Sequence, residues 1–83
     1  MKVSVEISLY PLCDDYIPPI QGFIDRLKGH AELKVIGNTM STQVYGEYEK
    51  VMAIVAREMQ ATHQDTPKAS FVMKVLNGDL SPQ

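Results

Sequence analysis

The 83-residue sequence is poor in cysteine, in long apolar runs and in clustered positive charge, and each shortage excludes a class of protein. Its single cysteine, Cys13, cannot form an internal disulfide, which is typical of a reducing compartment. No apolar stretch approaches the roughly 20 residues of a membrane-spanning helix, and no signal-peptide pattern follows Met1. We therefore expect a cytoplasmic protein that does not act at a membrane.

Charge and metal-binding residues are too sparse for several common functions. Eight basic residues stand against ten acidic ones and form no stripe, so we expect no nucleic-acid partner. Cys13, His30 and His63 lie far apart in the sequence, so we expect no metal site and no nucleophilic cysteine. With no nucleophile–base pair and no phosphate-binding loop, the sequence predicts neither an enzyme nor a resident cofactor.

The spacing of apolar residues predicts four strands and two helices. Residues 2–10 alternate between apolar and polar, as a half-buried strand does, and Pro11 ends the run. Residues 16–27 and 47–63 carry apolar side chains three or four positions apart, which is typical of amphipathic helices. Shorter strands are expected at 31–38, 40–47 and 70–77, the first two joined as a hairpin by a Gly37-Asn38 turn.

This order of elements is that of the ferredoxin-like α+β fold, a four-stranded antiparallel sheet with both helices on one face. Residues 1–78 are expected to form this single domain, and residues 79–83 a flexible tail. The other face of the sheet remains open and carries the polar positions of the first strand, Ser4, Glu6, Ser8 and Tyr10. Such a mixed face suits a wet interface between subunits or a small-ligand site.

The segment from Ser8 to Ile20 has two interpretations. In the simpler one it is a strand end, a proline corner and a helix capped by Asp14 or Asp15. In the other, Tyr10 and the two aspartates cluster at one end of the sheet, beside the hydroxyl groups of residues 39–42. Carboxylates accept hydrogen bonds from an amino group, a tyrosine ring stacks on a cation and hydroxyls bond ring nitrogens, so this cluster suits an amine-bearing heteroaromatic ligand.

Two motifs resemble the YkoF-like thiamine- and hydroxymethylpyrimidine-binding family. The first is Ser8-Leu9-Tyr10-Pro11 followed by Asp14-Asp15; the second is Met40-Ser41-Thr42 followed by Gly46 and Glu49-Lys50-Val51. The likeness runs from Val3 to about Val75. It implies non-enzymatic binding of thiamine or its hydroxymethylpyrimidine moiety, in support of transport or salvage. It also implies homo-dimers or tetramers that pair through the open sheet face.

The same resemblance assigns ligand-binding roles to seven residues: Ser8, Tyr10, Asp14, Asp15, Met40, Ser41 and Thr42. One of the two aspartates would accept from the aminopyrimidine, Tyr10 and Met40 would pack on the rings, and the hydroxyls would complete the polar contacts. Which aspartate binds and which caps the helix stays open. The alternative function is a structural or regulatory homo-oligomer that binds another small metabolite or none.

Overall fold

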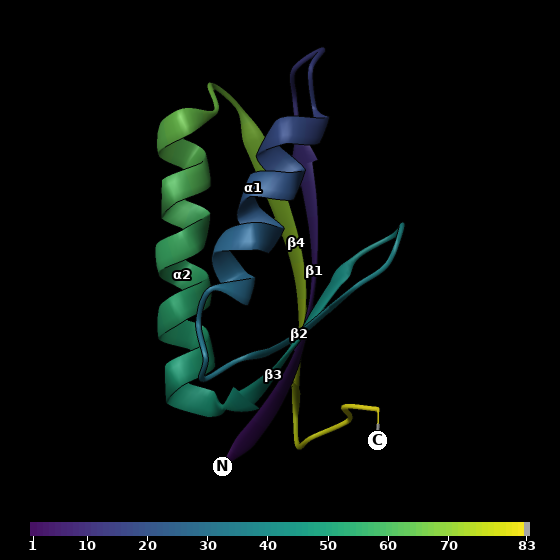
Figure 1. Cartoon of the computed structure of the whole chain (residues 1–83), viewed down its shortest axis with the longest axis vertical. Coiled ribbons are helices and arrows are strands. Elements are labelled where there is room, and N and C mark those ends of the chain that lie inside the picture. The colour runs from purple at the N-terminus through teal and green to yellow at the C-terminus, as the bar shows by residue number, and fades with distance from the viewer. Residues whose placement is uncertain (83) are drawn as a thin grey trace.

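The computed structural model describes residues 1–82 and confirms the ferredoxin-like α+β fold (Figure 1). Its elements are β1 (Lys2–Pro11), α1 (Ile17–Lys28), β2 (Lys34–Gly37), β3 (Thr42–Glu47), α2 (Tyr48–Asp65) and β4 (Ala69–Asn77). The strands form one antiparallel sheet in the order β2-β3-β1-β4, and both helices cover the same face. Gln83, the last residue of the expected tail, lies outside the described residues.

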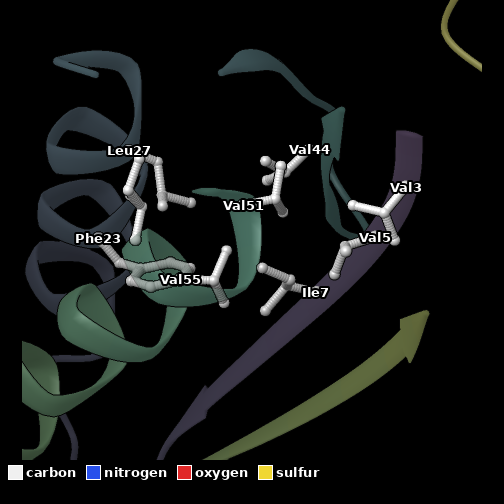
Figure 2. Packing of buried hydrophobic residues seen from close by; sticks show 9 residues of the cluster. Val3, Val5, Ile7, Phe23, Leu27, Val44, Val51 and Val55 are labelled. Carbon is white, nitrogen blue, oxygen red and sulfur yellow. The ribbon is translucent and has the colours of Figure 1, made fainter. Parts of the chain in front are cut away.

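The core lies between the two helices and the sheet. Figure 2 shows apolar side chains from α1, α2, β1 and β3 pointing into one shared space. These buried residues are Val3, Val5, Ile7, Phe23, Leu27, Val44, Val51, Ile54 and Val55. Full burial of a side chain of this size contributes roughly 1.5 to 3 kcal/mol, so this cluster is the main source of stability. The alternation predicted for the first strand is confirmed, because its odd-numbered residues face the helices.

The β2–β3 connection differs from the expected two-residue turn. Asn38 closes a longer loop: its side-chain oxygen accepts from the Met40 and Ser41 N–H groups at 2.8 and 2.9 Å, and its own N–H donates to the Ser41 carbonyl. An asparagine side chain stabilises such loops by replacing a backbone acceptor. Met40 therefore lies in the loop with 83% of its surface exposed, and does not share a strand face with Thr42 and Val44 as predicted.

The start of α1 corrects the expectation that Asp14 or Asp15 caps the helix. Tyr16 is the N-cap residue, and no side chain hydrogen-bonds to the helix start. A capping side chain accepts from the second or third N–H of a helix. These two positions are Pro18 and Pro19, which have no N–H to donate. Both aspartates are exposed, and neither caps the helix. Gly29 ends the helix as predicted.

A polar cluster that the sequence analysis missed joins α1 to α2. The Glu58 carboxylate of α2 accepts from Arg26 Nε at 2.9 Å and hydrogen-bonds His30 Nε2 at 2.8 Å. A second Arg26 nitrogen donates to the Thr62 hydroxyl and to the Glu58 carbonyl. The hydrogen bond from His30, with that from Arg26, lowers the pKa of Glu58 even though burial opposes this. The cluster therefore fixes the two helices against each other.

The chain after β4 folds back over the open face of the sheet. Gly78 adopts a positive φ of 112°, a conformation that favours glycine, and turns the chain. The Ser4 hydroxyl then donates to the Gly78 carbonyl at 2.8 Å and accepts from the Leu80 N–H at 2.9 Å. Farther along, the Pro82 carbonyl accepts from Lys34 Nζ. Residues 79–82 thus run along this face from Ser4 in β1 toward Lys34 in β2.

Candidate functional site

A pocket of about 460 Å³ opens between the end of β1, the start of α1 and the β2–β3 loop. This volume falls in the range of roughly 300 to 1,000 Å³ that small-molecule sites occupy. Its walls are mainly apolar and come from Ile7, Leu9, Ile20, Phe23 and Ile24, while its rim carries tyrosines, hydroxyls and an asparagine. An apolar interior with a polar rim suits a flat ring whose edge bears polar groups.

The pocket exists because β3 leaves β1 before β1 ends. The β1–β3 pairing stops at Ile7 and Thr42, whereas β1 stays paired with β4 as far as Pro11 and Ala69. Figure 1 shows the tip of the β2–β3 hairpin pointing away from the upper half of β1. The space that opens between them is bounded on the helix side by α1. The divergence of two neighbouring strands therefore creates the site.

Five of the seven predicted ligand-binding residues line this pocket, and the two aspartates do not. The five are Ser8, Tyr10, Met40, Ser41 and Thr42. Asp14 and Asp15 are exposed in the loop between Leu12 and Tyr16, both of which line the pocket. The carboxylates are therefore within two residues of the rim along the chain. Within residues 1–82, no hydrogen bond or ion pair joins either carboxylate to the lining.

The hydroxyl of Ser41 already has partners on the open face of the sheet. It donates to Glu6 at 2.9 Å and accepts from the Gln43 amide at 2.8 Å. The hydrogen bond from Ser41, together with the nearby charge of Lys74, lowers the pKa of Glu6. A ligand would have to compete for the Ser41 hydroxyl, whereas the Tyr10 side chain is 55% exposed and makes no such bond within residues 1–82.

Tyr16 and Phe23 are lining residues that the sequence analysis counted only as part of a helix stripe. Tyr16 precedes the helix, is 54% exposed and lines the pocket. Phe23 is buried and also lines the pocket. The double proline after Tyr16 was the available indication, because it delays the helix and leaves Tyr16 outside it.

Groups with metal-binding or nucleophilic chemistry do not converge in the part of the chain that the structure describes. No set of three His, Cys, Asp or Glu side chains there could hold a metal ion. His30 bonds Glu58 and His63 bonds the Ala69 carbonyl, while the exposed Cys13 thiol donates to the Asp15 carbonyl at 3.4 Å. Over residues 1–82, neither helix has the length and apolar character needed to cross a membrane.

Solved structures share this fold at low sequence identity. A Streptococcus pneumoniae protein is 22% identical with a TM-score of 0.87, the match covering 96% of this chain and 90% of that one. A Thermotoga maritima protein, provisionally assigned to thiamine biosynthesis or salvage, is 22% identical with a TM-score of 0.82, covering 90% and 82%. A Methanocaldococcus jannascii protein is 20% identical with a TM-score of 0.80, covering 98% and 84%. At these identities the likeness shows the fold alone.

Family membership rests on the sequence itself. No curated protein matches the sequence significantly. The model of the family described as YKOF-related, however, matches residues 2–81, which is almost the whole chain. This span includes every element of the sheet and both motifs that suggested the resemblance. The chain therefore belongs to the YKOF-related family.

Proposed function

We propose that the protein binds thiamine or its hydroxymethylpyrimidine moiety in the pocket at the end of β1, without catalysis, in support of thiamine or precursor transport or salvage. The observation that supports this most directly is the pocket itself, a mainly apolar cavity whose lining includes five of the residues expected from the family motifs. Family membership and the thiamine-related assignment of the Thermotoga maritima neighbour point to the same class of ligand.

The chemistry of thiamine matches the pocket in two ways. Its aminopyrimidine ring is flat, so its faces can pack on the apolar side chains of Ile20 and Phe23 while its edge meets polar groups of the lining. Its thiazolium ring carries a positive charge, which favours nearby tyrosine rings and carboxylates. In this proposal Tyr10 and Tyr16 supply the rings, and Asp14 or Asp15 supplies the negative charge and accepts a hydrogen bond from the amine of the aminopyrimidine.

The aspartates offer the sharpest test of this proposal, by isothermal titration calorimetry of thiamine, its monophosphate and hydroxymethylpyrimidine. If Asp15 is the binding acid, Asp15→Asn weakens thiamine affinity by ~1 to 3 kcal/mol, as for a lost charged hydrogen bond. Stability stays the same, because Asp15 does not cap α1. Asp14→Asn tests the other carboxylate in the same way. Asp25→Asn, an exposed acid of α1 outside the pocket lining, is the matched control.

The three titrations separate the possible results. Saturable heat with thiamine or hydroxymethylpyrimidine that weakens in only one aspartate variant supports the site and identifies the acid. Unchanged affinity in both variants rules out the assignment of the carboxylates. An absence of heat with all three ligands in a correctly folded sample refutes thiamine binding.

We also propose that copies of the chain pair through the open sheet face into a dimer or tetramer. Val72, Leu76 and Leu80 expose 55%, 45% and 67% of their surface there, an apolar area that a partner subunit would cover. This surface also favours the alternative function, an oligomer that binds another small metabolite or none. Light scattering measures the mass: an oligomer with no ligand heat favours the alternative, and a monomer at high concentration refutes the pairing.

A further inference from the structure

The direction of each backbone group along β1 follows from the hydrogen bonds at its two ends. The Met1 carbonyl accepts from Tyr48 on the β3 side, whereas the Lys2 carbonyl accepts from Gly78 on the β4 side. At the other end of β1, the Leu12 N–H donates to Lys68, again on the β4 side. The register is constant between these points, so odd-numbered residues direct their N–H and C=O toward β3 and even-numbered residues toward β4.

Leu9 is therefore left with an N–H and a C=O that face the pocket and have no strand partner among residues 1–82. The β1–β3 pairing ends at Ile7 and Thr42, one odd position earlier. Continued pairing would place Met40 opposite Leu9. The Met40 N–H instead donates to the Asn38 side chain, and the hairpin tip turns away from β1. Leu9 is half-buried and lines the pocket, so its free backbone groups border that cavity.

Pro11, the next odd-numbered residue, adds a second acceptor to the short edge of β1 that β3 leaves unpaired, which runs from Leu9 to Pro11. Pro11 also lines the pocket, and it presents a carbonyl but has no N–H. The edge thus offers one donor, from Leu9, and two acceptors, from Leu9 and Pro11. A proline at this place also prevents another strand from pairing along the edge, which favours a small molecule over a peptide strand.

We infer that the Leu9 backbone reads the pyrimidine edge of the ligand, its N–H donating to a ring nitrogen and its C=O accepting from the exocyclic amine. This inference rests on the proposed function. A 4-aminopyrimidine presents an acceptor beside a donor, which is the complement of a neighbouring N–H and C=O. The amine has a second N–H, which the Pro11 carbonyl or an aspartate can accept. The side chain of Leu9 takes no part in this recognition, so the sequence motif does not reveal it.

Amide hydrogen exchange followed by NMR tests the inference at one atom. In the free protein, the Leu9 amide exchanges faster than those of Ile7 and Tyr10, which are paired with β3 and β4. On saturation with hydroxymethylpyrimidine, exchange at Leu9 slows by at least about tenfold relative to Tyr10, as for one new hydrogen bond. The ratio to Tyr10 removes any general gain in stability from binding.

Ligand chemistry provides the second arm, by calorimetry. The analogue in which an oxo group replaces the amine reverses the donor and acceptor order, so it binds at least about tenfold more weakly than hydroxymethylpyrimidine. Binding of hydroxymethylpyrimidine with an unchanged Leu9 ratio, or equal binding of the oxo analogue, overturns this inference and leaves the proposed function standing. An absence of binding by thiamine and hydroxymethylpyrimidine overturns the proposed function and this inference together.

Discussion

Replacing Glu58 with glutamine tests whether the cluster between α1 and α2 holds the helices together. Glu58 is a buried residue of α2. Its carboxylate forms hydrogen bonds with Arg26, which lies in α1, and with His30, which follows α1. Glutamine keeps the shape and one oxygen but removes the charge, and its NH₂ group faces a donor where an oxygen accepted before. We expect Glu58→Gln to fold and to be less stable.

The size of the loss follows from the two hydrogen bonds and from their exposure to water. A hydrogen bond to a charged group contributes roughly 1.5 to 3 kcal/mol, so two of them set an upper limit of about 6 kcal/mol. The side chains of Arg26 and His30 are 34% and 24% exposed. Water can therefore hydrogen-bond to them when the bonds to Glu58 are lost, and this offsets much of the lost free energy. We expect the free energy of unfolding to fall by about 2 kcal/mol, a large part of the roughly 5 to 15 kcal/mol typical of a small domain.

The pH dependence of this loss has a definite sign. The folded protein holds the pKa of Glu58 below its ordinary value of 4.5, chiefly through His30, so the carboxylate stabilises the fold above that pH. The contribution disappears as the pH falls through the lower, folded-state pKa. The stability gap between the original protein and Glu58→Gln is therefore full at neutral pH and shrinks below about pH 4.5.

Urea unfolding followed by far-UV circular dichroism at pH 7 and at pH 3 measures both effects. Glu49→Gln is the matched control, because Glu49 is an exposed acid of the same helix with no such partners within residues 1–82. The control should change stability by no more than about 0.5 kcal/mol. An equal loss in the two variants, or a Glu58→Gln loss that stays the same at pH 3, would refute the assignment of the stabilisation to the Glu58 charge.

Two further predictions concern the chain after β4. Gly78→Ala should lower the free energy of unfolding by about 1 kcal/mol in urea titrations, because an L side chain is strained at its φ of 112°. Gly37→Ala, at a glycine with open space and no positive φ, is the control, and an equal loss in both would contradict the conformational reason. Ser4→Ala removes the acceptor of the Leu80 N–H, so amide exchange at Leu80 should accelerate; unchanged exchange would show that the tail does not depend on Ser4.

The sequence was sufficient to predict the fold because each element carries its own periodicity. Val3, Val5 and Ile7 alternate with polar residues, and α2 repeats its apolar residues every three or four positions. One sheet with two helices on one face is the simplest way to bury both patterns. The family motifs were predictable for the same reason, since they are local.

Features that depend on contacts distant in sequence were not predictable in this way. Glu58 lies on the apolar stripe of α2, and its partners come from another helix, so the periodicity suggested no reason for an acid there. The missing cap of α1 could have been anticipated, because Pro18 and Pro19 remove the donors that a cap would serve. The pocket required the angle at which the β2–β3 hairpin leaves β1, which no local pattern encodes.

One proline and one asparagine reduce the number of backbone donors that the pocket lining can offer to a ligand. Pro11, which lines the pocket, has no N–H group, and the Asn38 side chain accepts from the N–H groups of Met40 and Ser41. The lining therefore loses three possible backbone donors, whereas the carbonyls of Leu9 and Pro11 supply acceptors and the nearby Asp14 and Asp15 carboxylates supply negative charge. Anions are recognised by clustered N–H groups and are repelled by carboxylates such as those of Asp14 and Asp15. The balance disfavours phosphate and favours a ligand that donates hydrogen bonds and carries positive charge, which is the chemistry of an aminopyrimidine joined to a thiazolium ring.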